Sequence, residues 1–186
     1  MRSIASPTPT KIASMAAMLL AVVVCGCPGT TYTPLRVELG DELANFELVA
    51  GEPARHQDVI DLGEAPFEAS AGVLRFDSDR LSVSPAPGGA SKGSVNAHEG
   101  RAVEVTVRLA SAADVETVCE AGEVFGPFDL DFDTFNEFEA SVPAEVPLNA
   151  AALELIRAGT MSICIECSAE FAGTVRIGGL IFGLAP

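Results

Sequence analysis

The chain of 186 residues contains no tryptophan, and its single tyrosine, Tyr32, lies near the N-terminus. Sites that stack on sugar rings favour Trp and Tyr, because these side chains have a flat apolar face and a polar edge. The ten phenylalanines fall mostly on strand positions that we expect to be inside. Carbohydrate recognition through exposed aromatic rings is therefore disfavoured, although a site built from hydrogen bonds alone stays open.

Histidine is also scarce, since the chain has only His56 and His98. The stretch 89–93, GASKG, matches the G-x-S-x-G nucleophile elbow of serine hydrolases. That elbow requires a buried strand before it, a helix after it, and an acid and then a histidine later in the chain. Prolines precede the stretch, a strand pattern follows it, and His98 is the last histidine. The sequence therefore predicts a loop at 85–100 and no serine hydrolase.

Basic residues are few, with 11 Lys and Arg against 26 Asp and Glu, and they form no cluster. Proteins that bind nucleic acid use clustered Lys and Arg to neutralise phosphates, so a nucleic-acid partner is excluded. A strongly acidic domain is also repelled by anionic lipid headgroups. We therefore expect contact with a membrane only at the N-terminus.

The first 26 residues have the pattern of a secretory signal peptide. Arg2 and Lys11 precede an uncharged apolar run at 12–24. This run is shorter than the roughly 20 apolar residues of a membrane-spanning helix, and it has the length of a signal-peptide core. The pattern predicts export, with residues 1–26 removed from the mature protein.

The segment Val24-Cys25-Gly26-Cys27 resembles the lipobox of bacterial lipoproteins. The resemblance implies cleavage after Gly26 and a lipid on Cys27, which becomes the first mature residue. Two or more acyl chains anchor a protein stably to a bilayer. Because Pro28 and not Asp follows the cysteine, the resemblance also implies the outer membrane in a bacterium that has one. Ordinary signal peptidase would cut the same bond and leave a secreted or periplasmic protein.

Residues 27–34 read as a lipidated N-terminus and tether, rich in Pro, Gly and Thr. The remaining residues, 35–186, have the commonest size of a single domain and are numerous enough to bury a substantial core. We therefore predict one folded domain behind one short tether.

Alternation of apolar and polar residues dominates the domain, as in half-buried strands. The patterns predict strands at 35–39, 46–48, 59–62, 73–77, 81–84, 101–109, 128–132, 161–167 and 174–182. The last two are predicted to form a hairpin around Ala172-Gly173. The whole pattern favours an all-β fold, an antiparallel β-sandwich or jelly roll.

Two short helices are expected between the strands. Asn149 is a suitable N-cap for a helix that carries Leu153 and Ile156 and stops at Gly159. Ser111 begins a second helical segment of one or two turns that ends at Gly122.

The five cysteines are Cys25, Cys27, Cys119, Cys164 and Cys167. Cys25 leaves with the signal peptide. On one strand, Cys164 and Cys167 would lie about 10 Å apart on opposite faces, too far for a direct bridge. A disulfide from Cys119 to either of them is favoured, with Cys164 as the better buried partner. One alternative is a zinc site formed by these three cysteines and His98. Another is a redox role for the C-x-x-C pair.

Asp129, Asp131 and Asp133 alternate along a predicted strand and would project from one face. Such a stripe is compatible with calcium, but Thr134 and Ala140 replace the glycine and the bidentate glutamate of an EF-hand loop. Carboxylates on a strand also serve to keep its exposed surface soluble. A calcium site and a solvated face both remain open.

These observations predict an exported, membrane-tethered β-sandwich that is not an enzyme, has no cofactor, and acts as a structural module or binds a protein at the cell envelope. The alternative is a calcium-dependent adhesion or ligand-binding module that uses the acidic stripe. An enzyme that relies on carboxylates alone, as glycosidases do, is a poorer hypothesis, because the spatial separation of any carboxylate pair is not encoded in a local pattern.

Overall fold

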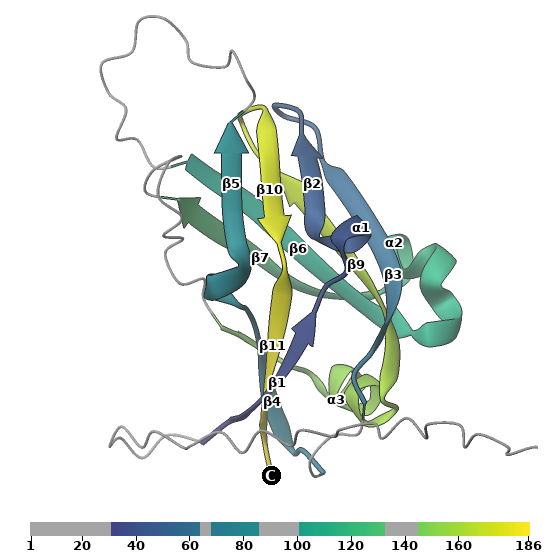
Figure 1. Ribbon diagram of the computed structural model, residues 1–186. Coiled ribbons are helices and arrows are strands. Elements are labelled where there is room, and N and C mark those ends of the chain that lie inside the picture. Colours follow the sequence, from purple (N-terminus) through teal and green to yellow (C-terminus); the bar gives the residue numbers. More distant parts are fainter. Residues whose placement is uncertain (1–30, 64–67, 86–100, 133–144) are drawn as a thin grey trace, which may run out of the picture.

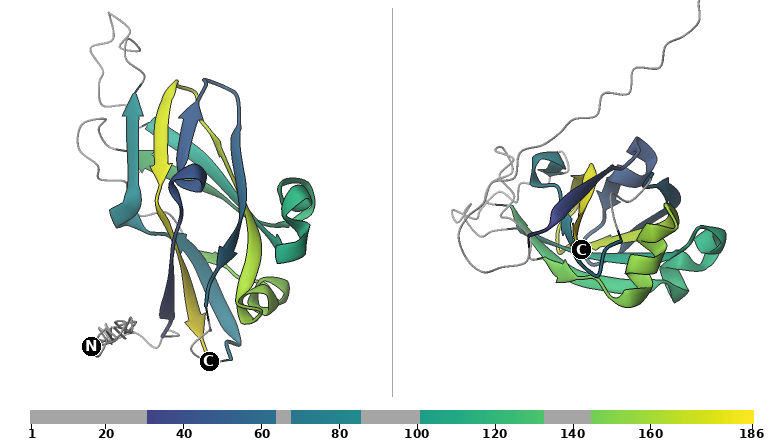
Figure 2. Two further views of the ribbon diagram at one scale, coloured as in Figure 1. Left: turned by 45° about the vertical axis from the view of Figure 1, so that its right-hand side comes forward. Right: turned by 90° about the horizontal axis from the view of Figure 1, so that it is seen from below.

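A computed structural model describes residues 31–63, 68–85, 101–132 and 145–186. Antiparallel strands form two packed layers, which confirms the predicted all-β sandwich (Figures 1 and 2). One layer, called the back sheet from here on, contains β3 (Ala54–Asp61), β9 (Thr160–Ser168), β6 (Arg101–Ser111) and β7 (Glu123–Phe132), in that spatial order.

The opposite layer, called the front layer, consists of two half-sheets. One contains β1 (Thr33–Glu38), β11 (Gly179–Ala185), β4 (Ala71–Phe76) and β8 (Val146–Pro147), and the other contains β2 (Asn45–Leu48), β10 (Gly173–Ile177) and β5 (Leu81–Pro85). β2 follows β1, β5 follows β4 and β11 follows β10 along the chain, and the strand order is the same in both halves. The front layer is therefore one three-stranded arrangement interrupted across its middle.

Short elements occupy this interruption: α1 (Asp41–Ala44) lies between β1 and β2, and η1 (Ser78–Arg80) between β4 and β5. Backbone bonds still cross it, because Leu39 N–H donates to Gly178 O at 3.1 Å and Gly178 N–H donates to Arg80 O at 2.8 Å. A Cβ on Gly179 would lie 3.2 Å from Val37 O, so a glycine permits this close approach.

A buried carboxylate also lies at the interruption. Asp77 is 5% exposed, and its Oδ2 is 2.8 Å from Arg36 Nη1 and 3.8 Å from Arg80 Nε. Arg80 also pairs with Glu38. Burial of a charge is tolerated when opposite charges and hydrogen bonds compensate for lost water. These ion pairs link β1 to the connection between β4 and β5.

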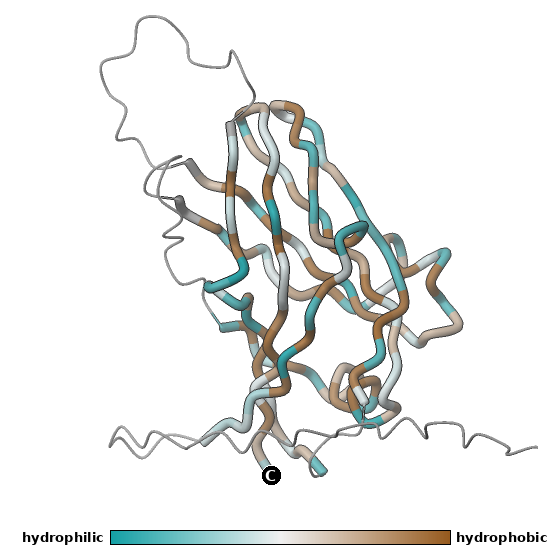
Figure 3. Tube along the Cα trace, in the orientation of Figure 1, coloured by the Kyte–Doolittle hydropathy of each residue, from teal (hydrophilic) through white to brown (hydrophobic). Residues whose placement is uncertain are grey.

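The core lies between the two layers. The inward positions of β6 predicted from its alternation are all buried, and those of β9 alternate in the same way: Val103, Val105, Val107, Leu109, Met161, Ile163, Ile165 and Cys167. Figure 3 shows the apolar residues recurring along these strands. Phe76 of the front layer packs edge-to-face on Phe128 of the back sheet, with ring centroids 4.9 Å apart. Each fully buried large apolar side chain contributes about 1.5–3 kcal/mol.

The predicted hairpin of 161–167 with 174–182 is wrong. β9 pairs with β3 and β6 in the back sheet, whereas β10 pairs with β2 and β5 in the front layer. The chain between them crosses from one layer to the other. Alternation marks both segments as strands, but it carries no information about which strand each one pairs with. The second segment is also divided, since β10 ends before Gly178.

The helix expected after Asn149 is confirmed as α3 (Ala150–Arg157). The Asn149 side chain accepts a hydrogen bond from Ala152 N–H at 2.9 Å, and Gly159 has a φ of +78° just after the last turn. The second helical segment is confirmed as η2 (Ala112–Thr117) and α2 (Val118–Ala121), and Ser111 Oγ accepts a hydrogen bond from Ala113 N–H. No helix in the described ranges is long and apolar enough to cross a membrane.

Candidate functional site

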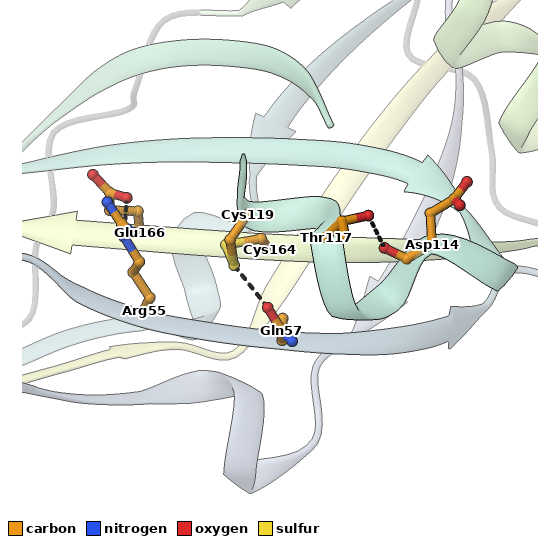
Figure 4. Close-up of a disulfide and its surroundings, with 7 residues drawn as sticks. All are labelled: Arg55, Gln57, Asp114, Thr117, Cys119, Cys164 and Glu166. Atoms are coloured by element: carbon orange, nitrogen blue, oxygen red, sulfur yellow. Dashed lines mark hydrogen bonds and ion pairs between the residues drawn. A yellow bond between two sulfur atoms is a disulfide. The ribbon is translucent and has the colours of Figure 1, made fainter. Parts of the chain in front are cut away.

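A disulfide joins Cys119 on α2 to Cys164 on β9, with Cα atoms 5.2 Å apart (Figure 4). It confirms the predicted bridge from Cys119 to one of the two C-x-x-C cysteines, and it selects Cys164, the slightly preferred partner. Cys164 lies on the outer face of the back sheet, whereas Cys167 belongs to the core between the layers. The two cysteines therefore occupy opposite faces of β9, as the strand geometry predicts.

The disulfide holds η2 and α2 against the outer face of β9. Val118 and Ser162 are both completely buried on that side of the sheet. The Ser162 Oγ has no hydrogen-bond partner among the described residues. β9 is consequently buried on both faces over much of its length, although its sequence alternates and the outward positions beside Cys164 are polar, with Ser162 buried and Glu166 half-buried.

Two side chains of β3 flank the bridge (Figure 4). Gln57 Oε1 lies 3.0 Å from Cys119 Sγ, a close contact and not a hydrogen bond, because a bridged sulfur carries no proton. Arg55 Nε lies 2.5 Å from Glu166 Oε2 on the neighbouring strand. The disulfide thus lies beside the outermost strand of the back sheet.

A hollow of about 340 Å³ opens between α1 and β3. Its lining residues are Glu42, Leu43, His56, Gln57 and Asp58. None of these five has a nucleophilic hydroxyl or thiol. The hollow offers two carboxylates, one imidazole and a small apolar surface, a set suited to binding a cationic group.

His56 forms one wall of this hollow. Its ring stacks on Phe46 of β2, with centroids 4.5 Å apart. The buried His56 Nδ1 has no hydrogen-bond partner in the part of the chain that the structure describes. The ring therefore acts here chiefly as a packing surface that fixes β3 against β2.

The acidic stripe is only partly described. Asp129 is exposed on β7, and its direct cross-strand neighbour on β6 is the exposed Glu104. Asp131 continues β7 opposite Ala102, and Asp133 lies outside the described residues. Glu104 thus extends the acidic stripe onto β6. The sequence pattern does not reveal this neighbour, because cross-strand pairs are set by register and not by local spacing.

No group of three or more His, Cys, Asp or Glu side chains in the described ranges could hold a metal ion. Cys119 and Cys164 are bridged, so neither is available as the thiolate that zinc requires. The alternative zinc set is therefore not assembled. Cys27, the loop segment 89–93 and His98 lie outside the described residues.

Cys167 is a free thiol buried in the core. Burial raises its pKa well above the ordinary value of a cysteine, and the nearby Glu166 carboxylate raises it further. The thiolate is the nucleophile and metal ligand, so a protonated, buried thiol is chemically inert. Cys167 functions here as a small apolar core residue.

The structure therefore concentrates its distinctive features along β3: the disulfide and its cover on one side, and the acidic hollow on the other. Comparisons of the chain with protein-family models, with curated proteins and with solved structures found no match.

Proposed function

We propose that this protein is an exported lipoprotein of the bacterial cell envelope, and that its β-sandwich is a non-catalytic module with a structural or protein-binding role. The observation that carries the proposal is the Cys119–Cys164 disulfide, in a chain that begins with a signal-peptide pattern. Disulfides persist in oxidising compartments and are rare in the cytosol. Fold and leader thus support the same location.

The position of the first strand supports a short lipid tether. Thr33, where β1 begins, pairs with Leu184 near the C-terminus, so both lie at one end of the sandwich (Figure 1). Five residues separate Cys27 from Thr33, and a fully extended chain of that length spans about 20 Å. A lipid on Cys27 would hold this end of the domain close to the bilayer. The turn between β2 and β3 would face away from it.

The experiment is intact-mass analysis of the protein extracted from the membranes of a bacterium that expresses the full chain. We expect a chain that begins at Cys27, carries acyl chains, and is lighter by the two hydrogens of one disulfide. Cys27→Ser should abolish both the lipid and the membrane association, whereas the matched variant Cys25→Ser should retain them. A mature chain without lipid in the soluble fraction would contradict the anchor.

A calcium-dependent binding role is a second candidate, and the Glu104–Asp129 pair is the observation that favours it. Like charges directly opposite each other on two strands destabilise a sheet, and a divalent cation would relieve the repulsion. Calcium normally takes six to eight oxygen ligands, of which this pair supplies a part. The candidate predicts a higher Tm in calcium than in magnesium. An unchanged Tm up to millimolar calcium would remove it.

A further inference from the structure

Among the described residues, β3 is an edge strand of the back sheet. In the described chain it pairs with β9 alone, over all of its eight residues. An edge strand presents a row of backbone N–H and C=O groups that another extended chain can pair with. Gln57, Asp58 and Val59, in the middle of the strand, are all exposed. β3 is therefore long and accessible enough to accept a further strand.

The other edges of the described sheets carry features that discourage such pairing. β7 contains Pro127 and a register shift, β1 contains Pro34, and β5 ends at Pro85. β8 and β2 are only two and four residues long. β3 has no proline, glycine or register shift. Natural sheets block their edges by these devices, so β3 is the described edge whose only protection is its charged side chains, Arg55, Asp58 and Asp61.

The backbone groups that face the open edge can be identified. Val59 N–H donates to the Asp58 side chain at 2.7 Å, so this group already has a partner within β3. Leu62 N–H, three residues on, donates to Gly159 O on the side of β9. Because successive residues of a strand alternate in direction, residues 55, 57 and 59 present their backbone groups to the open edge.

The surroundings of this edge are acidic. Glu42 and Asp58 line the hollow beside the strand, and Asp61 ends the strand. Arg55 is the one cation of β3, and it is already paired with Glu166. Val59 is 42% exposed and offers a small apolar contact. The complementary partner is an extended segment that carries Lys or Arg.

We propose that the β3 edge binds an extended, basic segment of another protein by strand addition, with a Lys or Arg side chain between Glu42 and Asp58. Backbone hydrogen bonds provide the affinity, and the acidic hollow selects the basic side chain. The proposal rests on the proposed protein-binding function and names its surface and partner chemistry. A second copy of this chain fits less well, because it would bring its own excess of acidic residues to the same edge.

The test uses the mature chain and a fluorescent eight-residue peptide of alternating Thr and Lys, with binding followed by anisotropy. One control peptide has Glu in place of Lys, and another has N-methyl groups on alternate residues, which remove the hydrogen bonds of one peptide edge. We expect the Lys peptide to bind at least about tenfold more tightly than either control. Hydrogen exchange should show new protection at residues 55, 57 and 59.

Val59→Pro should weaken binding of the Lys peptide by about tenfold or more, because it removes an outward N–H that exchanges its Asp58 partner for a peptide carbonyl on binding. Val59→Thr keeps that N–H and should bind like the natural chain. The pair Glu42→Gln and Asp58→Asn should also weaken binding. The matched pair Glu104→Gln and Asp129→Asn, on β6 and β7 at the far side of the back sheet from β3, should not.

Equal affinity for the Lys and Glu peptides, or binding that is unaffected by N-methylation, would overturn the proposal even if Val59→Pro failed to fold. Dimerisation that is lost in Val59→Pro would assign the edge to a second copy and also overturn it. The mass of the native protein is an independent result. Peptide binding by a chain without lipid would refute the anchor alone, and a lipidated chain that binds no Lys peptide would refute the edge proposal alone.

Discussion

The two layers of this sandwich differ in how long their strands continue and in what holds them together. In the back sheet β6 and β9 run for 11 and nine residues, and their inward positions are apolar from Val103 to Leu109 and from Met161 to Cys167. In the front layer no strand exceeds seven residues, because the chain is interrupted at α1, η1 and Gly178. The back sheet is tied to its cover by a disulfide, whereas the front layer is joined across its break by ion pairs around Asp77.

This difference shows what allows a strand to continue. The backbone ladder and the inward apolar residues must both persist, as they do along β6. At Asp77 a carboxylate takes a buried position, and its arginine partners fix the path of the chain there. The front layer therefore depends on specific polar contacts at its middle, and the back sheet depends on continuous apolar packing.

The largest expected effect tests how much the disulfide stabilises the back sheet and its cover. Replacing both Cys119 and Cys164 by Ala should lower the free energy of unfolding by about 4 kcal/mol, because the bridge spans 45 residues and its loss frees the unfolded chain. Urea unfolding measures the change. The natural chain in reducing agent should show a similar loss, and a loss below about 1 kcal/mol would show that α2 is held mainly by packing.

The next effect tests the ion pairs of the front layer. Asp77→Ala should cost about 2 kcal/mol, less than for a fully buried pair, because Arg36 and Arg80 remain half exposed to water. Asp79→Ala, two residues away and exposed, is the matched control and should stay within about 0.5 kcal/mol of the natural chain. Equal costs for the two variants would show that the break in the front layer does not depend on the buried carboxylate.

The third effect tests the apolar core beside the back sheet, through the pH dependence of stability that the buried Cys167 thiol causes. The folded thiol has a raised pKa and keeps its proton, while the unfolded thiol ionises above about pH 8.5. Alkaline pH therefore favours unfolding, and this contribution to stability is complete below pH 8.5 and falls above it. We expect the free energy of unfolding to fall by about 1.4 kcal/mol between pH 7 and pH 9.5, and this decrease should be absent in Cys167→Ala. The same alkaline slope in both proteins would contradict the assignment.

The smallest effect concerns the outer face of the back sheet. Glu104→Gln should raise stability by a few tenths of a kcal/mol at low salt, because it removes the repulsion between Glu104 and Asp129. The gain should shrink at high salt, where exposed charges are screened. Glu170→Gln, at an exposed position outside the strands, is the control for the change in net charge. A loss of stability in Glu104→Gln would indicate that the pair is compensated by other groups.

Local patterns predicted several elements correctly for identifiable reasons. The alternation of β6 marked its inward residues, and the Asn149 cap with Gly159 bounded α3. The strand spacing of Cys164 and Cys167 correctly placed them on opposite faces of β9, but it did not decide which of the two bridges to Cys119. In each case the cause lies within a few residues of the chain, because period, caps and left-handed positions are local properties.

Other features depended on contacts between distant residues. The hairpin was mispredicted because β9 and β10 have equally good strand patterns but pair in different layers. The hollow joins α1 to β3, and the Glu104–Asp129 pair joins β6 to β7. Neither combination follows from spacing, since register and layer are selected by the packing of the whole core.

By itself the sequence determined the class of fold, the two capped helical segments, and the expectation of an exported chain with a lipid on Cys27, because these depend on composition and on short patterns. Only the tertiary structure decided which sheet each strand joined, where the front layer broke, and that β3 is an edge strand among the described residues, beside an acidic hollow. An edge is a property of a strand's missing neighbour, and no residue within the strand encodes it.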